Sequence, residues 1–187
     1  MEKRKNEETF LSRLYRKRHQ GAEPPYYYYY SLGTILAKPV RKWFSAIFIP
    51  SIPFANLRIA LYRWCGYKIG KNVFIGMRCY LDDMCANLIE IEDNVIISYG
   101  VFFACHGRNQ GHNPIRIKKG AYIGMNSSLI ARQEEGLVIG ENSVVGACSM
   151  VNKSVPDNAT VAGTPAKVIA TAQASDSNAS SRNAPAS

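Results

Sequence analysis

Residues 69–86 read Ile-Gly-Lys-Asn-Val-Phe, Ile-Gly-Met-Arg-Cys-Tyr and Leu-Asp-Asp-Met-Cys-Ala, which is one six-residue pattern written three times. Each hexad begins with an aliphatic residue and has a small or β-branched residue at its fifth position. Such a repeat is typical of stacked architectures in which each unit is a short strand followed by a turn. The stretch therefore predicts a triangular coil whose first and fifth positions point inward, with neighbouring coils about 4.8 Å apart.

The same pattern recurs three more times along the chain. The later first positions are Ile91, Ile97, Phe103, Ile117, Ile123, Leu129, Ile139, Val145 and Val151. They are 6 residues apart within a triplet, whereas the steps between triplets are 10, 14 and 10 residues. Every insertion follows a third hexad, so we expect all three loops to leave from the same corner. Glycine is frequent at the second position, where a tight corner tolerates little bulk.

Cysteine usage indicates reduced, mostly buried thiols. The chain contains Cys65, Cys79, Cys85, Cys105 and Cys148, an odd number without a C-x-x-C motif. Neither a disulfide framework nor a zinc ribbon is indicated. Cys79 and Cys85 fall on fifth positions of the repeat, so we interpret them as core residues.

Charge is concentrated ahead of the repeat. Residues 1–71 hold 14 basic and 4 acidic side chains, whereas residues 72–187 hold 9 and 10. The sequence predicts a basic, aromatic-rich N-terminal arm over 1–65 with a short basic helix over 2–20, a repeat domain over 66–170, and a disordered tail over 171–187. The arm could cap the open end of the coil stack or contact a membrane interface, and both uses stay open. Nucleic-acid binding is disfavoured, because no known module is present.

No part of the chain has the composition of a membrane span or an export signal. The most hydrophobic run, from Trp43 to Leu57, is broken by Pro50 and Pro53 and is shorter than the roughly 18 residues that a spanning helix needs. A charged start is followed by a tyrosine run rather than by an apolar core and a cleavage site. We expect a cytoplasmic protein, with peripheral contact at the inner face of a membrane left open.

Two runs carry a family resemblance. They are I-S-Y-G-V-F-F-A-C-H (97–106) and I-G-E-N-S-V-V-G-A-C-S-M-V-N-K-S-V-P-D-N-A-T-V-A-G-T-P-A-K-V-I (139–169). Residues 66–170 resemble the hexapeptide-repeat acyltransferases, in particular the maltose, galactoside and surface-polysaccharide O-acetyltransferases. The resemblance implies an all-β, left-handed parallel β-helix of about four to five coils. It also implies acetyl-CoA as acyl donor, and a homotrimer with active sites between subunits.

The resemblance assigns catalysis to His106, which matches the family's catalytic histidine. An imidazole can accept the proton of an attacking hydroxyl near neutral pH and later return it to the thiolate. Asp82 and Asp83 match a segment that lines the acceptor pocket, and either could orient the imidazole or a sugar hydroxyl, or simply cap a corner. His112 is a further candidate for acceptor contact. Met77 stands near the place where sugar acetyltransferases often have asparagine, which leaves the acceptor open.

The resemblance also implies contacts to the cofactor. The residues carried over by matched motif are Tyr122, Met125, Ala147, Asn152, Lys153 and Lys167. Met125 and Ala147 would offer backbone groups to the pantetheine arm, and Lys167 would meet phosphate charge. No Walker-type loop or dinucleotide fingerprint occurs in the sequence.

The sequence therefore predicts an acetyl-CoA-dependent transfer of an acetyl group to a sugar hydroxyl, in surface polysaccharide or glycolipid biosynthesis, without a metal. Two alternatives stay open: N-acetylation of a nucleotide-linked amino sugar or small amine, and a non-catalytic β-helical scaffold. A γ-class carbonic anhydrase would share the coil but needs three zinc-binding histidines. Only His106 and His112 fall within the repeat, which disfavours that function.

Overall fold

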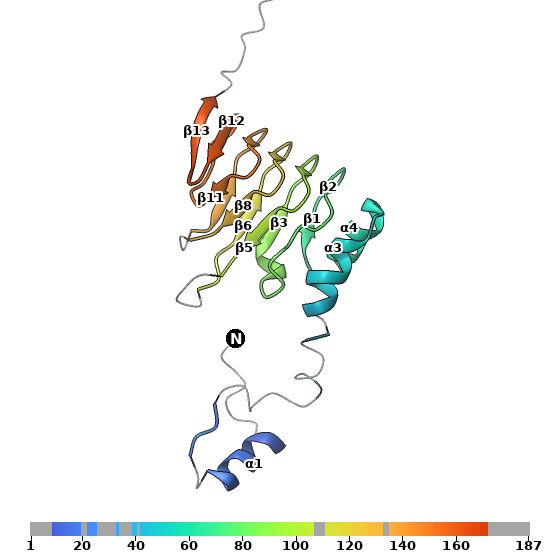
Figure 1. The fold of residues 1–187 in the computed structure, drawn as a ribbon, viewed down its shortest axis with the longest axis vertical. Coiled ribbons are helices and arrows are strands. Elements are labelled where there is room, and N and C mark those ends of the chain that lie inside the picture. The colour runs from blue at the N-terminus through green and yellow to red at the C-terminus, as the bar shows by residue number, and fades with distance from the viewer. Residues whose placement is uncertain are drawn as a thin grey trace, which may run out of the picture.

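The computed structural model describes residues 9–19, 22–25, 33, 39–40, 42–106, 111–132 and 135–171. Its strands form three sheets, which are the three faces of a prism (Figure 1). Sheet A contains β1 (Lys68–Ile69), β3 (Ile89–Ile91), β6 (Ile115–Ile117) and β9 (Leu137–Ile139). Sheet B contains β2 (Phe74–Ile75), β4 (Ile96–Ile97), β7 (Tyr122–Ile123), β10 (Val144–Val145), β12 (Ala159–Gly163) and β13 (Ala166–Thr171). Sheet C contains β5 (Phe102–Ala104), β8 (Ser128–Ile130) and β11 (Met150–Val151).

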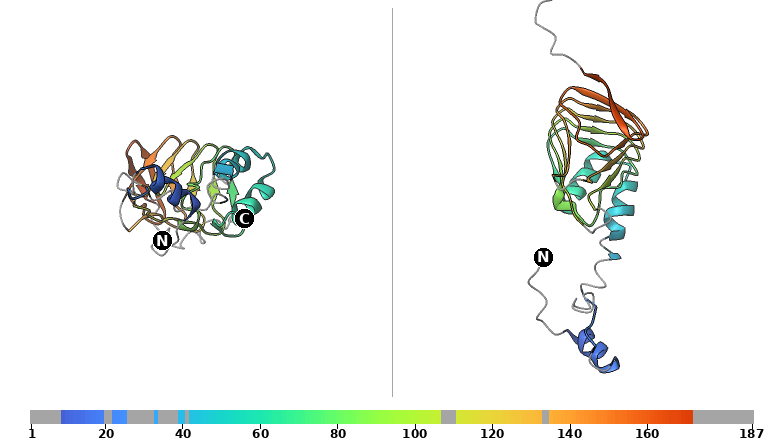
Figure 2. Two further views of the ribbon diagram at one scale, coloured as in Figure 1. Left: turned by 90° about the horizontal axis from the view of Figure 1, so that it is seen from below. Right: turned by 90° about the vertical axis from the view of Figure 1, so that its left-hand side faces the viewer.

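First-position residues stack directly on one another from coil to coil. Ile75 pairs with Ile97, Ile97 with Ile123, and Ile123 with Val145, always in parallel register. All four side chains are buried. Four complete coils and part of a fifth result, as Figure 2 shows from the side. The predicted parallel β-helix is therefore confirmed.

The interior is filled by the first and fifth positions, as the repeat predicts. Fifth-position Cys79 and Cys85 are buried and free, as is third-position Cys105, whereas Cys65 is half-buried and Cys148 is exposed. Burial raises the pKa of Cys85 to about 11 and that of Cys105 to about 12. The buried fifth-position serines satisfy their hydroxyl groups at the corner: Ser127 Oγ donates to the carbonyl of Gly124 at 2.8 Å. A hydroxyl paired in this way can enter the core without an orphaned polar group.

The corners depend on two positions of the hexad, of which the sequence analysis identified one. A Cβ on second-position Gly76 or Gly124 would lie 2.6 or 2.5 Å from the backbone nitrogen of the next coil, so these corners leave no room for a side chain. The fourth position adopts a left-handed conformation. Asparagine is its most frequent occupant, at Asn72, Asn94, Asn126, Asn142 and Asn158, and Arg78, Cys148, Gly100 and Gly120 hold the same position with positive φ. Asparagine tolerates this conformation better than other residues with a side chain.

All three insertions lie where a sheet C segment leads into a sheet A strand, which confirms the prediction of a shared corner. The first contains the short helix η3 (Ala86–Leu88). The second joins β5 to β6, and its residues 107–110 lie outside the described part of the chain. The third joins β8 to β9.

Helical segments close the N-terminal end of the prism. They are η2 (Phe44–Phe48), α3 (Ile49–Ser51) and α4 (Ala55–Trp64). Ile49, Ile59 and Tyr62 are buried with the core of the coil, so this part of the arm packs on the end of the prism. At the opposite end, β13 pairs antiparallel with β12, and Figure 1 shows the two strands closing the stack.

The predicted basic helix is shorter than residues 2–20. Helix α1 covers Phe10–Arg18, and the side chain of Thr9 caps it by accepting a hydrogen bond from the backbone N–H of Ser12. Residues 1–8, the tyrosine run and the tail from 172 lie outside the described residues. Among the helices that the structure describes, none has both the length and the apolarity needed to cross a membrane.

Candidate active site at the corner of the second coil

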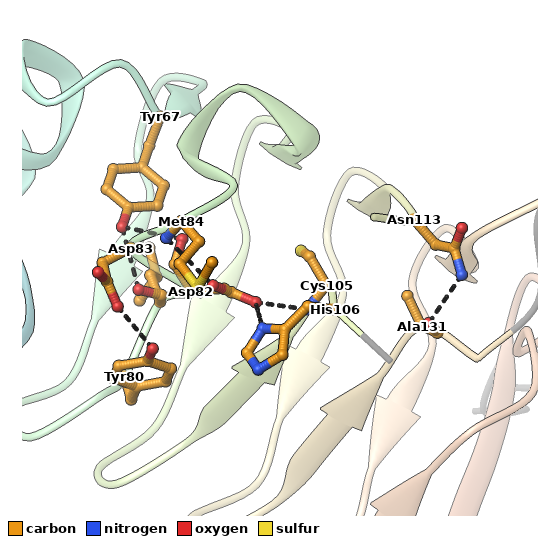
Figure 3. Close-up of polar contacts among 10 residues, drawn as sticks. Tyr67, Tyr80, Asp82, Asp83, Met84, Cys105, His106, Asn113 and Ala131 are labelled. Atoms are coloured by element: carbon orange, nitrogen blue, oxygen red, sulfur yellow. Dashed lines mark hydrogen bonds and ion pairs between the residues drawn. The ribbon is translucent and has the colours of Figure 1, made fainter. Parts of the chain in front are cut away.

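His106 lies just after β5, at the corner where the second loop leaves the coil. The first coil lies beneath it, because Tyr80 bridges to Phe102 in parallel register. That register places Asp82 under the end of β5. His106 Nδ1 lies 2.5 Å from Asp82 Oδ2 (Figure 3). The fold thus brings together two of the residues predicted from the sequence, which are 24 positions apart in the chain.

Asp82 is held by the backbone as well as by the imidazole. Its side chain is 0% exposed. Oδ2 accepts a hydrogen bond from the backbone N–H of Cys105 at 2.9 Å, and Oδ1 accepts one from that of Met84 at 3.2 Å. A buried carboxylate needs such donors in place of water. The carboxylate therefore has one orientation, and it transmits that orientation to the ring of His106.

The contact with Asp82 gives the two ring nitrogens of His106 different roles. When Nδ1 donates its proton to the carboxylate, Nε2 is the nitrogen with a free lone pair. The side chain of His106 is 44% exposed, so a substrate can approach it. Such an arrangement can support general base catalysis.

Asp83 has a different partner from Asp82. Its Oδ1 accepts a hydrogen bond from the hydroxyl of Tyr80 at 2.7 Å. The ring of Tyr80 stacks on Phe102 with a centroid distance of 4.7 Å. Burial, together with the bond to Asp83, raises the pKa of Tyr80, so the phenol stays protonated and donating. The expected role of Asp83 in acceptor binding stays a prediction.

The loop that follows His106 is fastened at its base. His112 forms an antiparallel bridge with His106, and the backbone N–H of Asn113 donates to the carbonyl of Cys105 at 2.7 Å. The side-chain amide of Asn113 reaches the carbonyl of Ala131, in the next coil, at 3.2 Å (Figure 3). His112 is exposed beside the dyad, where contact with an acceptor is geometrically open. Its role stays a prediction.

The residues predicted to bind the cofactor fall into separate groups on a single chain. Met125 and Ala147 stack at the corner between sheets B and C, and Tyr122 is exposed on sheet B. Asn152 and Lys153 lie after β11, at the corner that also carries His106. Lys167 lies in β13, opposite Ala162. One chain therefore does not bring the six residues together.

Two surface hollows lie away from the dyad. One of about 470 Å³ is lined by residues of sheet A that include Ile69, Ile91 and Lys119. A second, of about 250 Å³, is lined by residues that include Leu88, Arg116 and Leu137. Neither is lined by Asp82 or His106. In the part of the chain that the structure describes, no three His, Cys, Asp or Glu side chains are grouped to hold a metal ion.

The parallel coil and its six-residue repeat define the class of hexapeptide-repeat proteins. The family model for the hexapeptide repeat of succinyl-transferase matches residues 67–103 and 114–153. YvoF of Bacillus subtilis, a proposed acetyltransferase, is 30% identical over 123 residues, which cover 64% of this chain and 69% of that protein. The chain belongs to the hexapeptide-repeat acetyltransferases.

Other relatives agree with this assignment. The galactoside O-acetyltransferase of Escherichia coli is 32% identical over 120 residues, covering 55% of this chain and 56% of that one. The chain spans 59% of the length of proposed acetyltransferases from Staphylococcus aureus, to which it is 36% identical over 64% of its own length. A hexapeptide-repeat acetyltransferase of Vibrio cholerae, VCA0836, superposes with a TM-score of 0.58 at 26% identity, covering 73% of this chain and 92% of that one. A further structure of that Vibrio protein contains acetyl coenzyme A.

Sequence reasoning missed the groups that hold the site in place. The backbone donors of Cys105 and Met84 have no sequence signature of their own. The hydrogen bond from Tyr80 to Asp83 could have been found from the sequence, since the two residues are three positions apart across one corner. The stacking of Tyr80 on Phe102 also follows from the coil register, which places the two residues side by side.

Proposed function

We propose that this protein transfers the acetyl group of acetyl-CoA to a hydroxyl group of a sugar, with His106 as the general base and Asp82 as its positioning residue. The observation that carries the proposal is the 2.5 Å contact between His106 Nδ1 and the fully buried carboxylate of Asp82. It leaves Nε2 free on an exposed ring, which is the geometry that proton abstraction requires.

The reaction needs no covalent enzyme intermediate. The acceptor hydroxyl donates its proton to Nε2 while its oxygen attacks the thioester carbonyl. The resulting imidazolium is stabilised by the buried carboxylate of Asp82. When the tetrahedral intermediate collapses, the carbon–sulfur bond breaks, and Nε2 returns the proton to the departing thiolate. The products are the acetyl ester and free coenzyme A.

The donor and acceptor classes are supported by the relatives. The Vibrio protein, 26% identical, binds acetyl coenzyme A, and the E. coli relative is a galactoside O-acetyltransferase. A role in building a surface polysaccharide or glycolipid is part of the same proposal. It rests on the resemblance to surface-polysaccharide enzymes in the runs 97–106 and 139–169.

The proposal includes a homotrimer with shared active sites. Phe74, Ile96, Tyr122 and Val144 pair in register along sheet B, and all four are exposed on one chain. A continuous apolar row of this kind is typical of a surface that a partner covers. The cofactor residues of one chain also lie on different corners. A groove between two chains would bring different corners together.

The proposal is tested with the variants His106→Ala and Asp82→Asn. We expect turnover of acetyl-CoA with a sugar acceptor, followed as thiol release, to fall about 10² to 10⁴-fold for His106→Ala. Asp82→Asn should reduce it about 10 to 10³-fold, because the ring loses its orientation and its counter-charge. The affinity for acetyl-CoA should change less than about threefold in both. His19→Ala, at the C-cap of helix α1, is the matched control and should have the turnover of the wild type.

Three results would contradict parts of this proposal. Full turnover in His106→Ala would remove the base. Turnover with amino sugars but not with sugar hydroxyls would replace O-acetylation by N-acetylation. A monomer in analytical ultracentrifugation that retains full turnover would exclude a site shared between chains.

A further inference from the structure

The cap at the N-terminal end carries aromatic side chains on its outer surface. Trp43 is 52% exposed and Trp64 is 78% exposed. They belong to one connected cluster, since Trp43 lies 5.9 Å from Phe48, Phe48 lies 5.1 Å from Phe44, and Phe44 lies 6.1 Å from Trp64, measured between ring centroids. We call these four residues the cap aromatic cluster. Most large aromatic side chains of soluble proteins are buried, so this cluster requires an explanation.

Helix α4 shows that this exposure is an organised face. Its inward side carries Arg58, Ile59 and Tyr62, which are buried against the first coil. Its outward side carries exposed Leu57 and Trp64, which are seven positions apart and therefore on one face of the helix. The cap thus uses one side of α4 to close the prism and leaves an apolar side uncovered.

The chain segment that forms the cap carries charge of one sign. No aspartate or glutamate occurs between Glu23 and Asp82, whereas this interval contains eight lysines and arginines. Lys42, next to Trp43 in the chain, is exposed, whereas exposed Lys68 and Lys71 lie beside Glu90 and Asp93 of the second coil. Two copies of this surface would repel each other. A neutral apolar partner would make no favourable interaction with the positive charge. An anionic surface complements it.

We propose that the cap aromatic cluster and its surrounding basic residues bind the protein to the surface of a membrane that contains anionic lipids. Tryptophan favours the boundary between headgroups and acyl chains, because its ring is apolar and its N–H can reach a polar partner. Lysine and arginine add attraction to anionic headgroups. Neither of the two surface hollows is lined by the cluster, so it suits a soft, flat surface better than a ligand that must be enclosed.

The placement has a consequence for the acceptor. The carbonyls of Leu81 and Asp82 accept hydrogen bonds from Tyr67, just after the cap helix, at 3.0 and 3.4 Å (Figure 3). Asp82 therefore belongs to the coil next to the cap, and the dyad lies at the end of the prism that would face the lipid. An acceptor carried on a lipid would reach His106 without leaving the membrane surface.

Tryptophan fluorescence can test this proposal without an added label. Trp43 and Trp64 are its only tryptophans, and both belong to the cluster. Adding vesicles of phosphatidylcholine with phosphatidylglycerol to the full chain should shift tryptophan emission to shorter wavelength, and brominated lipid should quench it. Vesicles of phosphatidylcholine alone should give a weaker shift, and high salt should weaken binding to the anionic vesicles.

The variant Trp43→Ser with Trp64→Ser should lower the vesicle-bound fraction in sedimentation at least about tenfold. Val168→Ser with Ile169→Ser, which removes exposed apolar side chains at the opposite end of the prism, is the matched control and should bind like the wild type. Turnover with a soluble acceptor should stay unchanged in both.

Three results would overturn the proposal. The first is tryptophan emission that ignores anionic vesicles. The second is an equal loss of vesicle binding in the control variant. The third is a tryptophan variant that changes the oligomeric state while binding vesicles normally, which would assign the cluster to contact between copies. Because the emission of the wild-type chain is measured directly, the proposal stays testable if the tryptophan variant does not fold.

Discussion

The two ends of the prism are closed by different chemistry. Within the stack, the carbonyls of Ile91, Ile97 and Val101 accept hydrogen bonds from backbone N–H groups of the first coil, at 2.7 to 2.9 Å. The equivalent carbonyls of the first coil have no coil beneath them. They are Ile69, Ile75 and Cys79, and they accept instead from side chains of α4: Arg63, Arg58 and Tyr62, respectively.

The C-terminal end is closed by the backbone itself. Strand β12 continues sheet B from β10, and β13 then runs back antiparallel to it. Most of β13 is exposed, including Val168 and Ile169. An antiparallel strand pairs through main-chain groups that every residue carries, so few particular side chains are needed.

This difference between the two ends predicts where single substitutions lower the stability of the fold. At the N-terminal end, each edge carbonyl depends on one named side chain, and a buried carbonyl that loses its donor costs about 1 to 3 kcal/mol. At the C-terminal end, the main chain supplies the donors whatever the side chain is. Stability should therefore be sensitive to side chains in α4 and tolerant of them in β13.

The largest effect should come from Arg58→Met. Arg58 is 1% exposed, and its guanidinium donates to the carbonyls of Ile75 and Ile52. Methionine keeps the apolar stem but leaves both carbonyls without this donor. We expect the free energy of unfolding, measured by urea denaturation, to fall by about 3 to 5 kcal/mol. Arg116→Met, which breaks only an exposed pair with Glu90, should lose about 1 kcal/mol or less. Equal losses in the two variants would show that the guanidinium is not what closes this end.

A smaller effect is expected from Tyr67→Phe. The hydroxyl of Tyr67 donates to the carbonyl of Leu81 at 3.0 Å and lies 3.2 Å from Ser45 Oγ. Removing it should lower the free energy of unfolding by about 1 to 2 kcal/mol, in the same denaturation experiment. Tyr99→Phe, at an exposed corner, should have no measurable effect. A loss for Tyr67→Phe no greater than that for the control would mean that this carbonyl is satisfied without the phenol.

The repeat made most of the coil predictable, because a period of six residues fixes which side chains point inward and where the loops leave. It also placed Asp82 and His106 in neighbouring coils. The sequence predicted that Asp82 or Asp83 could orient the imidazole, but not that Asp82 would do so, since this depends on the backbone N–H groups that fix its carboxylate. The roles of Arg58 and Tyr62 were equally hidden, because a sequence shows the buried face of a helix but not the carbonyls that this face meets.

The smallest expected effect is on the pH dependence of stability. At the C-terminal end, the side chain of Asp157, rather than a main-chain carbonyl, accepts a backbone hydrogen bond. Its Oδ1 accepts from the backbone N–H of Glu141 at 2.8 Å and from Lys118 Nζ at 3.2 Å, and these bonds hold the pKa of Asp157 below its ordinary value. A carboxyl with a lowered pKa in the folded state stabilises the fold above its unfolded value of about 3.9, and this contribution is lost as the pH falls through the folded value. Thermal unfolding should therefore show that Asp157→Asn loses slightly less stability than the wild type between pH 5 and about pH 3. Glu141→Gln retains the backbone donor and should follow the wild type; if Asp157→Asn does so too, the last corner does not depend on this carboxylate.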